Sequence, residues 1–122
     1  MSAREEILGW GLVDWVALDR IHWCVAEENP GEPLPVNQNK TLNLIHSLVS
    51  DGMFVLGEVK RDVGFTAWNI SLEQSIQRIR GVYVTNFHDA NTWMWFCWLD
   101  ATEKGSQAAK ALAASQRSAQ DS

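Results

Sequence analysis

The clearest alternation of hydrophobic and polar positions runs over residues 37–51, where it predicts an amphipathic helix. Residues three or four positions apart fall on the same side of a wheel with 3.6 residues per turn, and here one side is mainly apolar and the other polar. The apolar side consists of Thr41, Leu42, Leu44, Ile45, Leu48 and Val49. Gly52 is predicted to end the helix in a left-handed conformation, and the apolar residues 53–56 to begin a strand.

The N-terminal residues predict an earlier helix. Ser2 and Glu5 have the spacing of a capping box, in which each side chain accepts a hydrogen bond from a free backbone N–H at the helix start. We predict a helix from residue 3 to about residue 15, followed by a short extended piece that ends near residue 18.

A second helix is predicted over residues 20–28, with Asp19 as its N-cap. The segment 29–36, NPGEPLPV, follows and holds all three prolines of the chain. Proline restricts its own backbone and that of the preceding residue, so we expect an extended, semi-rigid connection. That connection is about twice as long as the turn of three or four residues in a helix-turn-helix motif.

The centre of the chain predicts a short hairpin and another helix. Residues 60–64 have the composition of a polar turn, and residues 65–68 of a second short strand. Ser71 and Gln74 repeat the capping-box spacing, which predicts an inserted amphipathic helix over about residues 72–86. Its apolar positions are Leu72, Ile76, Ile79, Tyr83 and Phe87.

The densest apolar run, WMWFCWL, spans residues 93–99. It has no polar spacing, so it predicts a strand buried on both faces that pairs antiparallel with residues 53–59. Thr102 is a suitable N-cap for a C-terminal helix that continues to about Leu112. The small polar residues 113–122 are predicted to form a disordered tail.

Two segments resemble winged helix-turn-helix proteins of the type of the multiple-antibiotic-resistance repressors. They are the Leu-Asp-Ala-Thr-Glu-Lys-Gly segment over residues 99–105 and the predicted helix, turn and strand over residues 42–57. The resemblance implies a winged-helix-like α+β domain over residues 1–112: three N-terminal helical segments, a small antiparallel sheet with a helix inserted in the wing, and a C-terminal helix. A helix-only bundle is the alternative fold.

Composition and charge indicate one domain with an acidic N-terminal third. The chain has 122 residues, 46% of them apolar, and a formal charge of −5. Residues 1–35 hold seven acidic side chains against two arginines, and residues 36–90 are balanced. Duplex DNA is usually held by a clustered basic face, and none is visible in the sequence. We therefore expect a protein-interaction module of adaptor, antitoxin or immunity-like type, with a sequence-specific DNA-binding regulator as the alternative.

Other chemistry has little support in the sequence. Three histidines and two cysteines do not form the paired ligand spacing of a zinc site, and no glycine-rich phosphate loop is present, so we expect no enzyme, metal or cofactor. Cys24 and Cys97 are expected to be reduced core residues. No apolar run approaches the roughly 20 residues of a membrane span, and the N-terminus lacks a signal pattern, so we expect a cytoplasmic protein.

The polar face of the helix over residues 37–51 is the candidate binding surface. Asparagine can pair with adenine through two hydrogen bonds, and a lysine or arginine can hold a phosphate; a merely solvated face is the alternative. The candidate residues are Asn39, Lys40, Asn43, His46 and Ser47 on the helix, with Lys60 and Arg61 at the wing tip. Seven tryptophans are many for a small core, so we also expect Trp10 and Trp68 to be partly exposed at an interface, as in a homodimer.

Overall fold

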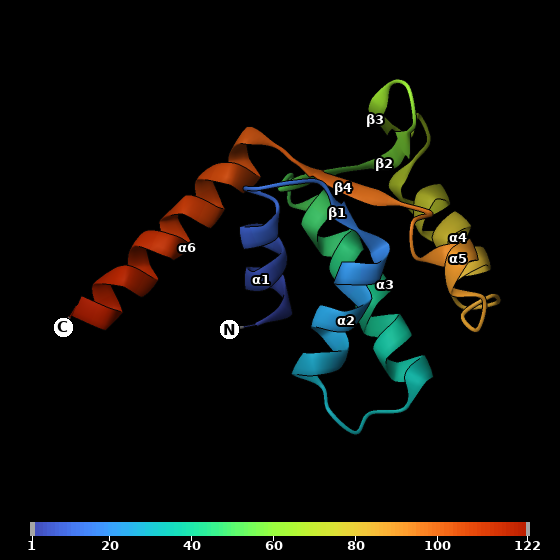
Figure 1. The fold of residues 1–122 in the computed structure, drawn as a ribbon, viewed down its shortest axis with the longest axis horizontal. Coiled ribbons are helices and arrows are strands. Elements are labelled where there is room, and N and C mark those ends of the chain that lie inside the picture. Colours follow the sequence, from blue (N-terminus) through green and yellow to red (C-terminus); the bar gives the residue numbers. More distant parts are fainter. Residues whose placement is uncertain (1, 122) are drawn as a thin grey trace.

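A computed structural model describes the backbone of residues 2–121 and the side chains of residues 2–117. The described part combines helices with one small antiparallel sheet, so the predicted α+β class is confirmed (Figure 1). The elements are α1 (Ala3–Trp10), β1 (Val16–Ala17), α2 (Leu18–Glu28), α3 (Leu34–Ser50), β2 (Phe54–Lys60), β3 (Gly64–Ala67), α4 (Leu72–Tyr83), α5 (Ala90–Trp93), β4 (Trp98–Ala101) and α6 (Glu103–Asp121).

The four strands are arranged in the order β1-β4-β2-β3, and every neighbouring pair is antiparallel. Leu99 of β4 lies between Val16 of β1 and Leu56 of β2, which confirms the predicted pairing of the C-terminal strand with β2. Helices α1, α2 and α3 lie below the sheet in Figure 1, whereas α6 begins beyond the left-hand end of β4 and leads away from it. One face of the sheet therefore packs against α1, α2 and α3 and forms part of the core. We call the other face, which is exposed to solvent, the open face.

Burial along β2 follows this division. Phe54 and Leu56 are buried against the helices, whereas Val55 between them is exposed on the open face. The core beneath the sheet is completed mainly by aliphatic side chains of α2 and α3. These side chains are Leu18, Ile21, Val25, Leu42, Ile45 and Leu48. Helical periodicity predicted those of α3.

The prediction of one continuous strand over residues 93–99 is wrong. Trp93 ends the short helix α5, and the chain turns before β4 begins at Trp98. The indole Nε1–H of Trp93 donates to the carbonyl of Phe87 at 2.7 Å, and the two rings stack at 4.8 Å between centroids. A buried indole N–H usually has such an acceptor, and Trp93 makes this contact from the helical segment. An apolar run does not by itself distinguish a strand from a buried turn or helix.

Several helix boundaries differ from the prediction. Helix α1 ends at Trp10 with Gly11 as C-cap, not near residue 15. Helix α2 begins at Leu18, so Asp19 lies in its first turn and does not cap it. Helix α3 begins at Leu34, with a proline in its first turn, where a missing N–H costs nothing. The connection between α2 and α3 is therefore the five residues 29–33, shorter than predicted.

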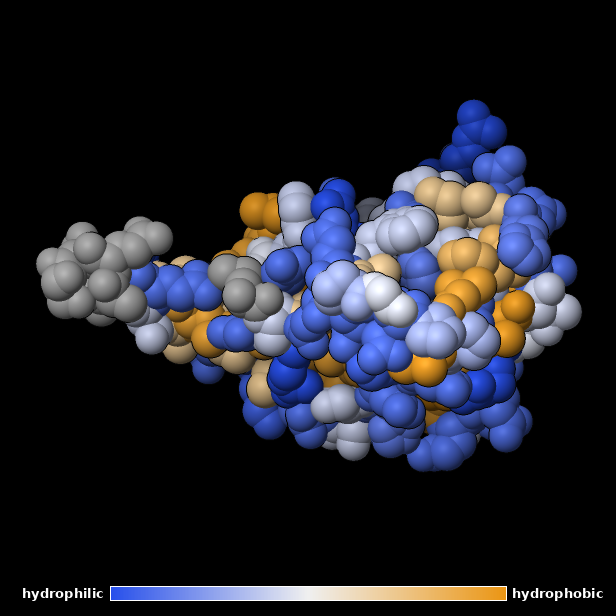
Figure 2. Space-filling view, turned by 90° about the horizontal axis from the view of Figure 1, so that it is seen from below, coloured by the Kyte–Doolittle hydropathy of each residue, from blue (hydrophilic) through white to orange (hydrophobic). Residues whose placement is uncertain are grey.

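Three predicted helix starts are confirmed. Both capping boxes form, at α1 and at α4, although α4 ends at Tyr83 and not near residue 86. The Thr102 hydroxyl accepts the N–H of Gly105 at 3.1 Å, as expected of the N-cap of α6. Helix α6 is longer than predicted: it continues past Leu112 to Asp121, through the segment predicted to be disordered, and Ser122 lies outside the described residues. Helix α6 projects from the body of the molecule (Figure 2).

Candidate binding surfaces

The five candidate residues of α3 are at least partly exposed, and all of them except Asn43 contact neighbouring elements. Asn37, Gln38 and Thr41, also polar, are instead buried. Asn39 and Lys40 are exposed. The Lys40 ammonium donates to Oδ1 of Asn29 at 2.7 Å, and the Arg80 guanidinium of α4 donates to Oδ1 of Asn39 at 3.1 Å. Both side chains therefore link α3 to its surroundings.

The C-terminal half of this face is bonded in the same way. Arg4 of α1 donates to the Ser47 hydroxyl at 3.0 Å and forms an ion pair with Asp51 at 2.8 Å. The Nε2 atom of His46 lies 3.5 Å from a carboxylate oxygen of Glu73 in α4. Helices α1 and α4 are thus joined to the face that was expected to meet a ligand.

The structure does not bring all the predicted residues together. Lys40 and Asn43 line one shallow hollow of about 290 Å³ between α1, α2 and α3. Lys60 and Arg61 lie at the tip of the β2–β3 hairpin, and Lys60 is 3.9 Å from Glu58. The hairpin tip and the N-terminal end of α3 are at opposite ends of the molecule in Figure 1, so these basic residues do not extend the α3 face.

A different surface has the composition of a binding site. A hollow of about 360 Å³ opens beside β1 and is lined by four tryptophans. We call this hollow the tryptophan groove. Trp95 is 52% exposed, Trp10 is 43% exposed and Trp15 is 38% exposed, whereas Trp98 is half-buried. The groove is completed by Val13, Asp14, Val16, Ala17, Asp19 and Arg20.

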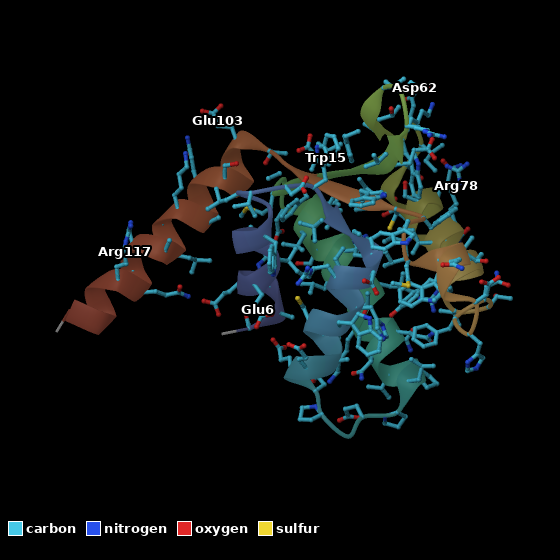
Figure 3. All side chains as sticks on the ribbon, viewed as in Figure 1. Glu6, Trp15, Asp62, Arg78, Glu103 and Arg117 are labelled. Carbon is cyan, nitrogen blue, oxygen red and sulfur yellow. The ribbon has the colours of Figure 1, made fainter. Side chains whose placement is uncertain are left out.

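Strand pairing assembles the tryptophan groove from distant parts of the sequence. Trp10 ends α1, Trp15 immediately precedes β1, and Ala17 of β1 pairs with Trp98 of β4. The Trp98 Nε1–H donates to the carbonyl of Trp95 at 3.2 Å, and their rings stack with centroids 5.7 Å apart. Figure 3 places Trp15 at the sheet, on the side away from α2 and α3. The tight turn before β4 thus presents two indoles to one hollow.

Charged groups border these indoles. The Arg20 guanidinium lies over the Trp10 ring, 4.1 Å from its centroid. One oxygen of Asp14 accepts the backbone N–H of Trp15 at 2.7 Å, and one oxygen of Asp19 accepts the indole N–H of Trp23 at 2.9 Å. Within residues 2–117, neither carboxylate has a basic nitrogen within 4.0 Å.

A second hollow of about 390 Å³ adjoins the groove and shares Trp10 and Arg20 with it. Its other lining side chains include Glu6, Trp23 and Glu27. The two hollows together carry four carboxylates and one guanidinium, a formal charge of −3. This part of the surface is therefore both aromatic and acidic.

The thiols near these surfaces are not activated. Burial raises the pKa of Cys24 to about 12, and the neighbouring Glu6 carboxylate adds to the shift. Burial also raises the pKa of Cys97 well above its usual range. Both cysteines are free and buried, as predicted. Because only the thiolate is a strong nucleophile, neither residue has the environment of a catalytic cysteine.

His22 of α2 is buried in the interior of the protein. His22 Nδ1 is hydrogen-bonded to the Tyr83 hydroxyl, and the rings of Trp23, Phe87 and Trp93 pack around the imidazole. Burial lowers the pKa of His22, because the charged imidazolium loses hydration there. We call His22, Tyr83, Phe87 and Trp93 the inner aromatic cluster.

No family model, curated protein or solved structure matches this chain. Among the described residues, no group of three or more histidine, cysteine, aspartate or glutamate side chains is placed to hold a metal ion. The described helices also include none that is long and apolar enough to cross a membrane.

The sequence pointed to this surface only in part. Its excess of tryptophan predicted exposed indoles, and Trp10 is one of them. Trp68, the other residue named, is half-buried between the Phe96 ring and the Arg78 guanidinium. Trp15 and Trp95 were missed, because their proximity depends on the pairing of β1 with β4 and on a turn that the apolar run concealed.

Proposed function

We propose that this chain is a non-enzymatic protein-interaction module that binds its partner through the tryptophan groove. The observation that carries the proposal is a hollow lined by four tryptophans, three of them more than a third exposed. An exposed indole leaves a large apolar area in water, and tryptophan is enriched among the residues that dominate binding energy at interfaces. A protein partner would cover that area and donate hydrogen bonds to the carboxylates of Asp14 and Asp19 at its edge.

Two further observations support this proposal. The chain is acidic overall, with a formal charge of −5, which suits a protein ligand better than a polyanion. Three side chains of α3 that could hold phosphate or bases, Asn39, Lys40 and Ser47, are bonded to α4, Asn29 and α1 respectively. Free, buried cysteines also accord with a reducing compartment such as the cytoplasm.

Affinity capture from the native host tests the proposal when it compares two matched variants. Trp95→Ala removes an exposed indole from the groove, and Val63→Ala removes an exposed side chain from the β2–β3 turn. We expect one stoichiometric partner to be retained by the parent and by Val63→Ala but lost with Trp95→Ala. Equal retention by all three proteins would refute the groove as the binding surface.

A sequence-specific DNA-binding regulator of winged-helix type is the second candidate. Its support is the element order helix, strand, helix, helix, strand, the pairing β1-β4-β2, and the five-residue connection before α3. These features agree with the resemblance in residues 42–57 and 99–105. The inserted α4, which bonds to Asn39 and approaches His46, leaves less of α3 free to enter a groove of DNA.

Gel-shift titration on genomic fragments separates the two candidates. If DNA is bound, Lys40→Ala should weaken binding to all fragments and reduce the salt dependence, because it removes a phosphate contact. Asn43→Ala should instead relax preference at one base position, at a cost of about 1–3 kcal/mol. We expect no retention of DNA by the parent at about 0.15 M salt. Tight binding that Lys40→Ala destroys would favour the regulator.

A further inference from the structure

We propose that the tryptophan groove binds the side chain of an arginine in a flexible segment of the partner. This inference rests on the proposed function and names the chemistry of the partner. It follows from the aromatic faces, the carboxylates and the local charge of the groove, and each of these points to a planar cation.

The groove already holds one guanidinium against one of its indoles. Arg20 lies 4.1 Å above the Trp10 ring, in the geometry of a cation–π contact. Trp95 and Trp98 form a second aromatic surface, and Trp95 is 52% exposed. A guanidinium is flat and weakly hydrated, so it stacks on an indole face more readily than the compact ammonium of lysine. The second surface therefore suits the same group that occupies the first.

The carboxylates supply acceptors for such a cation. Asp14 and Asp19 each use one oxygen in a hydrogen bond to a tryptophan N–H. The other oxygen of each carboxylate forms no hydrogen bond or ion pair within the described part of the chain. A guanidinium has five N–H donors in one plane, so it can stack on an indole and donate to a neighbouring carboxylate at the same time.

The local charge disfavours an anionic ligand. The groove and the adjoining hollow carry a formal charge of −3, with Glu6 and Glu27 beside the shared Trp10. A phosphate or an acidic peptide would find only the Arg20 guanidinium as a cation in these two hollows, against four carboxylates. A basic segment would instead lower the repulsion among them.

Titration followed by ¹⁵N-labelled indole signals tests this inference on the full chain. The probe is acetyl-Gly-Arg-Ser-Arg-Gly-amide, and the matched peptides carry lysine or glutamine in place of both arginines. We expect the indole signals of Trp10, Trp95 and Trp98 to shift with the arginine peptide. The signal of Trp93, which is buried and bonded to Phe87, should stay in place. The lysine peptide should bind about fivefold more weakly, and the glutamine peptide should cause no shift.

Variants of the groove should reduce this affinity in a graded way. Asp14→Asn and Asp19→Asn should each weaken binding about two- to fivefold, as expected for partly exposed charge pairs. Trp95→Leu should weaken it about fivefold through the loss of an aromatic face. Asp62→Asn, at the tip of the β2–β3 hairpin (Figure 3), should leave it unchanged. An unshifted Trp93 signal in each variant shows that the fold is retained.

The outcomes separate this inference from the function on which it rests. Equal shifts with the arginine and glutamine peptides, or no shift with either, would overturn the arginine specificity. If capture of a partner is still lost with Trp95→Ala while Asp14→Asn and Asp19→Asn retain it fully, the groove binds a protein but not a cation. If the labelled chain instead self-associates through the groove, a second copy is the occupant and the inference is wrong.

Discussion

Two aromatic regions, the inner aromatic cluster and the tryptophan groove, lie beside helix α2. Both contain tryptophans, but one is buried and the other is exposed. The inner aromatic cluster surrounds His22, and its indole and phenol groups have hydrogen-bond partners within the protein. In the tryptophan groove, Trp95 and Trp10 are 52% and 43% exposed, and Asp14 and Asp19 each have one oxygen without a partner among the side chains that the structure describes. Trp93 and Trp95 are only two positions apart, yet they belong to different regions.

The difference shows that the residue type alone does not decide whether a tryptophan belongs to the core of this protein. What decides it is whether the indole has hydrogen-bond and packing partners within the fold. Burial of an indole is favoured by a hydrogen-bond acceptor and close aromatic neighbours, both of which Trp93 has. The groove keeps large apolar faces in water, which is unfavourable for the isolated chain unless a ligand covers them. Stability and binding should therefore respond to different tryptophans.

The largest difference in stability should appear when Trp93 and Trp95 are replaced by alanine in two separate variants. Trp93→Ala empties a fully enclosed position and leaves the Phe87 carbonyl without its donor, so we expect a loss of about 3–5 kcal/mol in the free energy of unfolding. Trp95→Ala should cost less than about 1 kcal/mol, because that side chain is largely exposed. Urea unfolding measures both values. Similar losses would show that the groove is part of the core.

Acid should weaken the inner aromatic cluster selectively. Burial lowers the pKa of His22 in the folded state, so between that value and the unfolded value of about 6.5 the unfolded chain binds more protons. The contribution of neutral His22 is present in full above about pH 6.5 and is lost as the pH falls toward the folded pKa. Asp19 opposes the shift but contributes less to it than burial.

Urea midpoints between pH 7.5 and 5 measure this loss. His46→Asn and His88→Asn are the matched controls, because neither residue belongs to the cluster. We expect the parent and both variants to lose stability alike on acidification. If either variant abolishes the pH dependence, then that histidine and not His22 is responsible.

Smaller effects are expected on the polar face of α3, where the contacts are partly exposed. Arg4→Ala removes the bonds to Ser47 and Asp51 and should cost about 0.5–1 kcal/mol. Lys40→Ala removes one exposed bond to Asn29 and should cost less than about 0.5 kcal/mol. Thermal unfolding of the two variants against the parent provides the comparison. A larger loss for Lys40→Ala would reverse this ordering.

Local patterns in the sequence predicted much of the fold. The capping boxes of α1 and α4 and the N-cap Thr102 are short-range signals, because each depends on residues three apart. The apolar side of α3 followed from helical periodicity alone. Antiparallel pairing of β4 with β2 was also predicted, since both segments are strongly apolar.

The candidate site was less predictable, because it depends on long-range contacts. Periodicity placed Asn39 and Lys40 on a polar face, but it carries no information about Arg80 or Asn29, which are bonded to them. The run over residues 93–99 conceals a helix end and a turn, and only the tertiary acceptor for Trp93 distinguishes these from a strand. Trp15 and Trp98 reach the same groove through the pairing of β4 with β1, and β1 is a strand of only two residues.

Site-specific photo-crosslinking tests the central claim most directly. A photoreactive phenylalanine derivative is placed at Val13, which lines the groove and is 74% exposed, or at Val63 in the β2–β3 turn, which is 73% exposed. Equal exposure makes the second position a matched control. In cells of the native host, we predict a single crosslinked protein product from position 13 and none from position 63. A product from position 63 alone, or crosslinks to nucleic acid and not to protein, would contradict the assignment of the tryptophan groove as the interaction surface.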